Sequence, residues 1–286
     1  MKEIPPLNAA AVLKRHGLRA DKRLGQNFLQ DPFALEAIAS AAEIQPTDTV
    51  LEIGPGLGSL TRYLAASAKQ VIAVELDRDL LIPLRAVIAP YQNVQVIHGD
   101  ILKLSPQKLI TEKDYIVAAN IPYYITSAVI RHLLAESPKR ESDVKPRRIV
   151  LTVQKEVAER ICAKPGDMSL LALSVQVYGK PHIAARIPAE AFFPAPKVDS
   201  AVLSVDIYPA PLIKPELIES FFKMIKAGFS QKRKTLRNSL SSGLHIPTSA
   251  SEALLKQASI DPMRRAETLS IEEWQALCEI KTDSAV

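Results

Sequence analysis

Residues 49–58 read Thr-Val-Leu-Glu-Ile-Gly-Pro-Gly-Leu-Gly, which predicts a short apolar strand that ends in a glycine turn. Beyond the turn, Leu57, Leu60, Tyr63 and Leu64 recur at the spacing of one helical face. Glycine adopts positive φ angles readily and lets a ligand come close to the backbone. We therefore expect a strand, a turn and a helix, with the turn facing a ligand.

Three further apolar stretches have strand character, and a polar residue closes each of them. These are 71–75, which ends at Glu75, 94–97, which His98, Gly99 and Asp100 follow, and 115–119, which Asn120 follows. A helical pattern over 79–88, interrupted by Pro83, separates two of these strands. Strands that alternate with helices predict a parallel, doubly wound sheet, and such sheets bind ligands at the carboxyl ends of their strands.

The rest of the first 207 residues continues the α/β pattern. We expect one helix that begins at Asp31-Pro32, with the apolar face Leu35, Ile38, Ala39 and Ala42, and a second that begins at Thr126 or Ser127, with the apolar face Val129, Ile130, Leu133 and Leu134. A third helix is expected around Val157, Ala158 and Ile161. We expect strands at 148–153, about 170–178 and 200–207, and a polar, basic and exposed connection at 137–148.

A linker with Pro209, Pro211 and Pro215 separates a second region whose pattern is helical. Leu217, Ile218, Phe221, Phe222 and Ile225 form one face, and two capping boxes, Ser249 with Glu252 and Ser270 with Glu273, predict further helices. We expect a catalytic domain of Rossmann-like α/β fold at 1–207, with a basic N-terminal arm, and a small all-helical domain at 208–286.

Composition narrows the class of protein. The chain of 286 residues carries 36 Lys and Arg against 31 Asp and Glu, a net charge of +5, which permits a polyanionic partner. Cys162 and Cys278 lack metal-ligand spacing and there are only five histidines, so we expect no disulfide framework and no metal site. No apolar run approaches the roughly 20 residues of a membrane span, and we expect a soluble, cytoplasmic protein.

The polar strand ends suit an adenosine moiety. Glu75 lies 21 residues after Gly54 and is placed to accept both ribose hydroxyls. Asp100 can accept from an adenine amino group, although it can also simply cap the segment that starts at Ile101. A dinucleotide fingerprint would need a third glycine at Ser59, and Gly58 comes one residue early. The glycine turn and Glu75 therefore fit the adenosine part of either a nicotinamide dinucleotide or S-adenosylmethionine.

Asn120-Ile121-Pro122-Tyr123 favours the second cofactor. A dehydrogenase has no need of this loop, whereas a methyltransferase for an exocyclic amine needs acceptors on the N–H bonds, because the amine lone pair is delocalised into its ring. The Asn120 side-chain oxygen and the Ile121 carbonyl supply them, Pro122 fixes the backbone, and Tyr123 can stack on the base. The alternative for this tetrapeptide alone is a strand end, a turn and core tyrosines, and we assign no role to Tyr124.

Several motifs resemble those of the ribosomal RNA adenine N6,N6-dimethyltransferases, and the resemblance runs from about residue 20 to residue 275. The motifs are Leu24-Gly25-Gln26-Asn27-Phe28-Leu29, Glu52-Ile53-Gly54-Pro55-Gly56-Leu57-Gly58, Asn120-Ile121-Pro122-Tyr123, Phe192-x-Pro194-x-Pro196-x-Val198-Asp199-Ser200, Gln231-Lys232-Arg233-Lys234-Thr235-Leu236-Arg237-Asn238 and Arg265-Ala266-Glu267-Thr268-Leu269-Ser270. The last two resemble the small-subunit branch, whose loss confers kasugamycin resistance, more than the large-subunit macrolide-resistance methylases.

This resemblance implies dimethylation of two adjacent adenosines in a hairpin near the 3′ end of 16S rRNA, within the small (30S) ribosomal subunit, by a monomer that uses S-adenosyl-L-methionine. It places the target adenine between Tyr123 and Phe192. It implies cofactor contacts at Asn27, Leu29, Gly54, Gly56, Glu75, Asp100 and Asn120. One segment, Ser169-Leu170-Leu171-Ala172-Leu173-Ser174, differs from the pattern of the family. The difference does not affect the residues expected to carry the chemistry, but it bears on RNA contacts.

Given an RNA substrate, a basic run in the helical region is expected to contact phosphates. Its residues are Lys232, Arg233, Lys234 and Arg237. Three alternatives stay open: an adenine methylase of large-subunit rRNA or DNA, a ribosome-assembly factor that keeps the fold without turnover, and, more distantly, a nicotinamide dehydrogenase.

Overall fold

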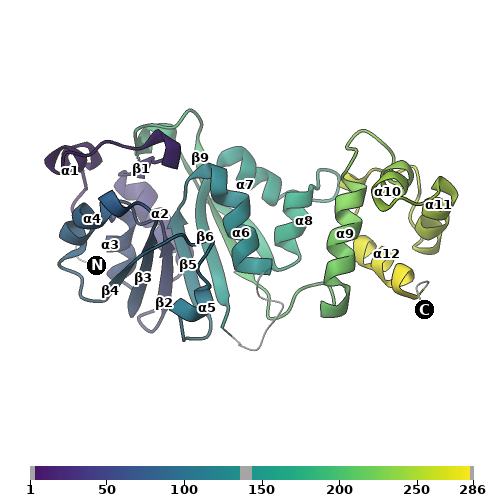
Figure 1. Ribbon diagram of the computed structural model, residues 1–286, viewed down its shortest axis with the longest axis horizontal. Coiled ribbons are helices and arrows are strands. Elements are labelled where there is room, and N and C mark those ends of the chain that lie inside the picture. The colour runs from purple at the N-terminus through teal and green to yellow at the C-terminus, as the bar shows by residue number, and fades with distance from the viewer. Residues whose placement is uncertain (1–3, 136–143, 284–286) are drawn as a thin grey trace. The chain divides into compact units, whose positions relative to one another are not determined.

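A computed structural model describes residues 4–135 and 144–283 (Figure 1). Most of the exposed connection expected at 137–148 lies outside the described residues. The chain divides into two compact units, the first made of residues up to Ala158 together with Pro181–Ile207, and the second of Glu159–Lys180 together with the residues from Tyr208 onward. Residues 159–180, which the sequence pattern assigns to the catalytic domain, thus pack with the helical region.

The first unit is built on a seven-stranded sheet in the order β4-β3-β2-β5-β6-β9-β7. Its strands are β2 (Thr49–Ile53), β3 (Gln70–Glu75), β4 (Val94–His98), β5 (Tyr115–Asn120), β6 (Pro146–Gln154), β7 (Gly179–Ile187) and β9 (Ser200–Ile207). The pairs from β4 to β6 are parallel, which confirms the predicted α/β sheet, and β9 pairs antiparallel with β6.

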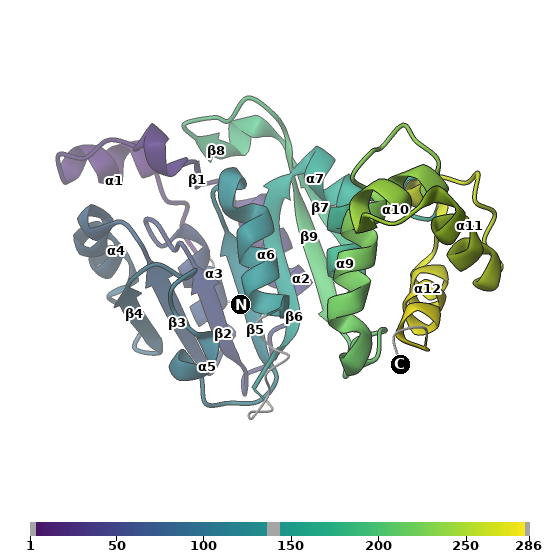
Figure 2. The same cartoon turned by 45° about the vertical axis from the view of Figure 1, so that its right-hand side comes forward.

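Helices cover both faces of this sheet. α2 (Pro32–Ala42) and α3 (Ser59–Ala65) bury their apolar sides in one core cluster with Val50, Ile116 and Val150 of the strands. α6 (Thr126–Ala135) lies on the opposite face from α2, as Figure 2 shows. The remaining helices are α1 (Ala9–Arg15), α4 (Leu81–Ile88), α5 (Pro106–Leu109) and α7 (Lys155–Ile161), which runs across the boundary between the units.

A second, two-stranded sheet joins segments that are distant in the sequence. β1 (Phe28–Leu29) pairs antiparallel with β8 (Phe192–Phe193), so that Leu29 lies opposite Phe192. Both of these side chains are buried in the same core cluster as α2 and α3. The pairing holds the loop that precedes β1 against the carboxyl edge of the large sheet.

Two local predictions are wrong. The apolar stretch at 170–178 is not a strand, because α8 (Leu170–Gln176) begins there and the Ser169 hydroxyl caps it by accepting from the Ala172 N–H at 3.1 Å. In so short an apolar run, hydrophobic periodicity cannot distinguish a buried helix from a buried strand. Nor does Pro83 interrupt its helix, since it lies in the first turn of α4, where its missing N–H would have no intrahelical partner.

The second unit is helical apart from the first residues of β7. It contains α8, α9 (Ile218–Gly228), α10 (Leu236–Leu244), α11 (Thr248–Gln257) and α12 (Ile271–Asp283). Phe221 and Trp274 are fully buried in it. The segment 159–180 is tied in by backbone hydrogen bonds from the Gly166 and Met168 N–H groups to the Glu267 carbonyl, at 2.9 and 3.1 Å.

One of the two predicted capping boxes forms. The Ser270 N–H donates to the Glu273 carboxylate at 2.8 Å, and the Glu273 N–H donates to the Ser270 hydroxyl at 3.3 Å. The box predicted at Ser249 does not form, because α11 starts at Thr248 and Ser249 already lies inside it. None of the helices in the described ranges combines the length and the apolar character of a membrane span.

Candidate functional site

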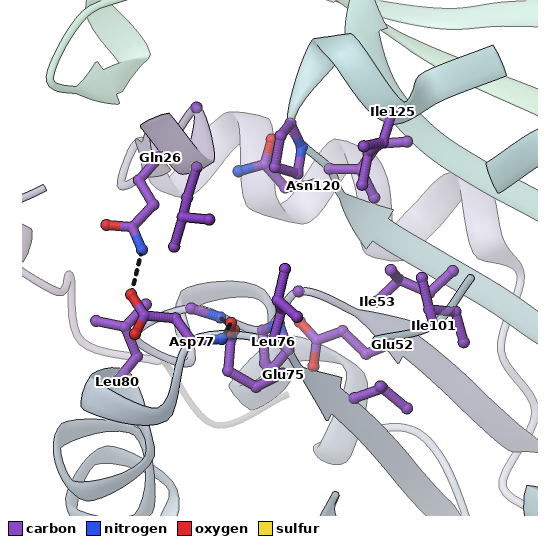
Figure 3. A pocket seen from close by; sticks show the side chains of 18 of the residues that line it. Gln26, Glu52, Ile53, Glu75, Leu76, Asp77, Leu80, Ile101, Asn120 and Ile125 are labelled. Carbon is purple, nitrogen blue, oxygen red and sulfur yellow. Dashed lines mark hydrogen bonds between the residues drawn. The ribbon is translucent and has the colours of Figure 1, made fainter. Parts of the chain in front are cut away.

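A cavity of about 310 Å³ opens at the carboxyl ends of β2, β3, β4 and β5 in the first unit. The glycine turn, the ends of the next two strands, the Asn120 loop and the loop before β1 all line it (Figure 3). The predicted residues that line it are Asn27, Leu29, Gly54, Gly56, Glu75, Asp100, Asn120, Ile121, Pro122 and Tyr123. The structure therefore brings together every predicted cofactor residue and all but one of the predicted catalytic residues.

The glycine turn shapes the floor of the cavity. Gly54, Gly56 and Gly58 all have positive φ angles, of 66°, 58° and 84°. A Cβ atom at Gly56 would lie 3.2 Å from the Phe28 ring, whereas one at Gly54 would meet nothing within 4 Å. The turn therefore has no room for a side chain at Gly56 and has open space beside Gly54, where a ligand can approach the backbone.

Glu75 is buried and holds the glycine turn to the loop after β3. One carboxylate oxygen accepts from the Gly56 N–H at 2.9 Å and the other from the Asp77 N–H at 2.8 Å. Burial raises the pKa of Glu75, and the two backbone hydrogen bonds act in the opposite direction. Each oxygen keeps a further lone pair, so the carboxylate can still accept from the hydroxyl groups of a sugar.

Glu52 lines the cavity beside Glu75. It belongs to one of the family motifs, but the sequence assigns it no role in the site. It is 1% exposed, and one of its carboxylate oxygens has no hydrogen-bond partner among the described residues. Burial, reinforced by the nearby negative charge of Glu75, raises the pKa of Glu52 to about 8, although the Thr61 hydroxyl opposes the shift. The sequence signal that could have identified Glu52 is the presence of an acidic residue inside an apolar strand.

Asp100 serves two purposes. Its carboxylate accepts from the Leu102 N–H at 3.0 Å, which caps the turn that begins at Ile101. The same residue lines the cavity, together with Ile101. Leu76, at the end of the neighbouring strand, also lines the cavity and is 49% exposed, so it offers an apolar surface to a planar ring.

The loop before β1 closes one side of the cavity. The Gln26 side-chain amide donates to the Asp77 carboxylate at 2.6 Å, as the dashed line in Figure 3 shows. The Gln26 side-chain oxygen accepts from the Asp21 N–H at 2.8 Å. This loop is thus fixed to the end of β3 by a contact between residues 51 positions apart.

Asn120 is fixed to the same loop. Its side-chain NH2 group donates to the Asn27 backbone carbonyl at 3.1 Å. Because a carbonyl can only accept, this contact assigns the two ends of the amide and leaves the Asn120 oxygen available as an acceptor. Ile121 is buried, and Pro122 precedes a short 3-10 turn over Tyr123–Ile125.

Of the aromatic residues near this loop, Tyr123 lines the cavity and Phe192 does not. The Tyr123 hydroxyl lies 2.6 Å from the hydroxyl of Ser200, a fully buried residue at the start of β9. Burial raises the pKa of Tyr123. Phe192 is only 3% exposed and packs in the core beneath β1. Tyr124, in contrast, lines the mouth of the cavity and is 64% exposed.

The predicted RNA-contacting residues lie in the second unit, on and after the loop between α9 and α10. Lys232, Arg233 and Lys234 are exposed. Arg237 is half-buried and forms an ion pair with Glu252 at 3.2 Å. In the part of the chain that the structure describes, no cluster of His, Cys, Asp and Glu side chains is arranged to hold a metal ion.

Sequence comparison identifies one family. The family model described as ribosomal RNA adenine dimethylase matches residues 17–283. A protein of Dehalococcoides mccartyi named ribosomal RNA small subunit methyltransferase A is 47% identical over 98% of this chain and 95% of its own length. A protein of the same name from Alkaliphilus metalliredigens is 41% identical over 96% of each chain.

Solved structures agree in fold. A dimethyladenosine transferase from Plasmodium falciparum aligns with a TM-score of 0.73 at 25% identity, covering 91% of this chain and 98% of its own. The 23S rRNA methyltransferase ErmE aligns with a TM-score of 0.68 at 28% identity, covering 88% of this chain and 98% of its own. The curated relatives with higher identity are the ones named after the small subunit.

Proposed function

Because this chain belongs to the ribosomal RNA adenine dimethylase family, we propose that it transfers methyl groups from S-adenosylmethionine to the N6 amines of two adjacent adenosines in a hairpin near the 3′ end of 16S rRNA. The names of its curated relatives support the small subunit as the source of the substrate. The observation that carries the chemistry is the orientation of Asn120, whose amide nitrogen is occupied by Asn27 and whose oxygen is available.

The cavity fits S-adenosylmethionine by shape and by charge. Glu52 and Glu75 bring two buried carboxyl groups to the glycine turn, and one Glu52 oxygen lacks a partner among the described residues. A bound ligand that carries a sulfonium and an ammonium group would stabilise the ionised form of both carboxyl groups. The pyrophosphate of a nicotinamide dinucleotide would instead lie near acids, with no Lys or Arg among the described residues that line the cavity to pair with it, which argues against the dehydrogenase alternative.

Each part of the cofactor has a candidate partner in the cavity. Glu75 would accept the two ribose hydroxyl groups, and Asp100 the adenine amino group. Leu76 and Ile101 offer apolar surface for the adenine ring, while Asn27, Leu29, Gly54 and Gly56 enclose the rest. When bound, S-adenosylmethionine supplies an electrophilic methyl group on its sulfonium sulfur.

The Asn120 loop would prepare the target amine for attack. The Asn120 oxygen and the Ile121 carbonyl accept hydrogen bonds from the two N–H bonds of the adenine N6, which draws the nitrogen toward tetrahedral geometry and localises its lone pair. Holding the amine in line with the methyl group supplies much of the remaining acceleration. No strong base is needed beforehand, because the amine loses its proton readily once it has gained the methyl group.

The same contacts explain why transfer would stop at two methyl groups. After the first transfer the nitrogen keeps one N–H bond, which Asn120 or Ile121 can still accept. After the second transfer no N–H bond remains, and both acceptors lose their partner. Leaving buried acceptors without partners disfavours the bound state, so the dimethylated base would be released.

Tyr123 and Phe192 would have different tasks. Tyr123 lines the cavity and is held by Ser200, so its ring is placed to stack on the target base. Phe192, buried behind β1, would act by supporting the loop that carries Asn27. A direct contact of Phe192 with the base would require a rearrangement of β1 and β8.

The helical region from residue 208 onward would recognise the ribosomal RNA. Lys232, Arg233 and Lys234 are exposed cations on one loop, suited to phosphates. Arg237 would contribute less, since Glu252 already pairs with it. We propose that the enzyme acts as a monomer in the cytoplasm on the small (30S) subunit, with a role in its assembly.

The test is transfer of a labelled methyl group to undermethylated small subunits, followed by mass spectrometry of the nucleosides. We expect N6,N6-dimethyladenosine at two adjacent positions. Transfer only to large-subunit RNA or only to DNA would overturn the assignment. Binding to the small subunit without any transfer would identify an assembly factor that has lost its catalytic function.

A further inference from the structure

Tyr124 is the residue of the cavity mouth that the proposed reaction leaves without a task. It follows Tyr123 directly, lines the cavity, and is 64% exposed. Isolated exposed aromatic side chains are common on protein surfaces and need no explanation by themselves. Tyr124 differs because its ring is held in place beside a site for a nucleobase.

The support for the ring comes from Gly25. A Cβ atom built on Gly25 would lie 3.2 Å and 3.3 Å from two carbons of the Tyr124 ring and 3.2 Å from Pro122. Gly25 also has a φ angle of 64°, in the left-handed region that other residues rarely adopt. The absence of a side chain at Gly25 therefore lets the ring lie against the backbone of the loop before β1.

Gly25 and Tyr124 connect the two segments that form the target side of the cavity. Asn27, two residues after Gly25, accepts from Asn120, four residues before Tyr124. The Asn27 side chain in turn donates to the Gly25 carbonyl at 3.1 Å. The position of the Tyr124 ring is thus fixed relative to Asn120, the residue proposed to hold the amine.

Two cations precede Gly25 closely in the chain. Lys22 and Arg23 form the short turn that Gly25 terminates, and both are exposed. Arg23 pairs with Asp21 at 2.9 Å. A flat aromatic face with an accessible cation nearby is the combination that binds one nucleotide of a single strand, its base by stacking and its phosphate by charge.

We propose that Tyr124, supported by Gly25, forms a second base-binding subsite that stacks the nucleobase adjacent to the target adenine in the RNA strand. This inference rests on the proposed function, because it requires an RNA strand that enters at the Asn120 loop. It assigns Tyr124 to substrate positioning rather than to chemistry. The neighbouring base would be held outside the cavity while the target base lies within it.

Two variants of Tyr124 and one control test the proposal. Tyr124→Phe keeps the ring, whereas Tyr124→Leu keeps apolar bulk without a flat face, and Phe33→Leu is the control, because Phe33 is 80% exposed in the same unit and does not line the cavity. With small subunits as substrate, Tyr124→Leu should raise KM by about 5-fold to 160-fold, the range that base stacking on an aromatic ring contributes. The kcat value and the Kd for S-adenosylmethionine should stay unchanged.

The conservative variant separates the ring from the hydroxyl group. Tyr124→Phe should restore KM to within about twofold of the unsubstituted enzyme, and Phe33→Leu should leave it unchanged. A Gly25→Ala substitution should raise KM in the parent enzyme, and only part of that increase should persist in the Tyr124→Leu background, because the clash with the Tyr124 ring is then gone while the close approach to Pro122 and the positive φ remain.

Several outcomes would overturn the subsite. These are an unchanged KM in Tyr124→Leu, a Tyr124→Phe variant as impaired as Tyr124→Leu, or a Kd for the cofactor that rises in parallel with KM, which would make Tyr124 a cover for the cofactor. Failure of the proposed function gives a different result, since the unsubstituted enzyme would then transfer no methyl group to small subunits.

Discussion

The side-chain NH2 group of Asn120 donates a hydrogen bond to the backbone carbonyl of Asn27, a residue 93 positions earlier in the chain, at 3.1 Å. This contact joins the end of β5 to the loop before β1. It also decides which end of the Asn120 amide is free, because the carbonyl cannot donate. The acceptor that the proposed reaction uses is therefore oriented by the fold before any substrate arrives.

Replacing Asn120 should separate catalysis from binding. In Asn120→Ala we expect kcat to fall by about 100-fold to 1000-fold, the cost of removing one preorganised hydrogen-bonding group. Affinity for the small subunit should stay close to that of the unsubstituted enzyme, because most contacts with RNA are made to phosphates. Single-turnover transfer and filter binding measure the two quantities.

Gln92→Ala is a matched control for that experiment, since Gln92 is an amide side chain that does not line the cavity. It should change neither quantity. An Asn120→Ala enzyme with most of its activity would refute the role proposed for this side chain.

The contact between Tyr123 and Ser200 predicts a pair of equivalent variants. Ser200→Ala removes the partner 2.6 Å from the Tyr123 hydroxyl, and Tyr123→Phe removes the hydroxyl itself. Each should lower kcat about fivefold, which corresponds to one hydrogen bond of about 1 kcal/mol. The double variant should be no worse than either single one, and Ser204→Ala, a buried serine of the same strand, should have no effect.

Glu52 predicts how stability depends on pH. Its pKa is raised to about 8 in the folded protein, from 4.5. Between these values the folded state holds a proton that the unfolded state releases, so the contribution of Glu52 to the free energy of unfolding falls as pH rises from 4.5 to 8. Below this window the acid is protonated in both states and the contribution is constant.

Glu52→Gln should remove this dependence. We expect the difference in free energy of unfolding between Glu52→Gln and the parent to grow in favour of the variant as pH rises from about 5 to about 8, by an amount on the order of a few kcal/mol. Urea denaturation at several pH values, without cofactor, measures it. A constant difference across this range would show that Glu52 is ionised in the folded protein.

The basic loop of the second unit predicts a change in salt dependence. Lys232, Lys234 and Arg233 are exposed, and replacing all three with Ala should weaken small-subunit binding and reduce the slope of log K against log salt by about 0.7 to 0.9 for each phosphate that is no longer neutralised. Lys108→Ala, at an exposed lysine of the first unit, is the control and should leave the slope unchanged.

Arg237→Ala should behave differently from the loop variants. Because Arg237 pairs with Glu252 at 3.2 Å and is half-buried, its removal should lower the thermal stability of the protein more than it changes the slope. A larger change in slope for Arg237→Ala than for Lys234→Ala would show that RNA displaces Glu252 from the arginine.

The sequence predicts the part of the site that consists of strand ends. Gly54, Glu75, Asp100 and Asn120 each follow or close a short apolar strand, and parallel strands bring their carboxyl ends to one edge. The contacts between the loop before β1 and these ends have no comparable signal. Gln26 and Asp77 are 51 residues apart, and only the folded chain shows that they form a hydrogen bond.

The burial of individual side chains is a second property that local sequence patterns do not predict. Phe192 reads as an aromatic residue in a proline-rich loop, yet its pairing with Leu29 in a two-stranded sheet places it in the core. Glu52 reads as one acid in an apolar strand, and its raised pKa arises first from its burial and then from the charge of Glu75 on the neighbouring strand. Tyr124, to which the sequence assigns no role, differs from both because it is exposed.

The second unit is formed by two separate segments of the chain, which limits how these enzymes can be recombined. Because Glu159–Lys180 belongs to it, the chain passes between the units at residues 158/159, 180/181 and 207/208. A chimaera that exchanged only the segment after residue 207 with a relative would place a foreign residue 222 against the native Tyr178, on whose ring Phe222 stacks with ring centroids 6.3 Å apart. Exchange of the proposed RNA-recognition unit between relatives therefore requires both of its segments to be transplanted together, and evolution by simple fusion of a terminal module would face the same constraint.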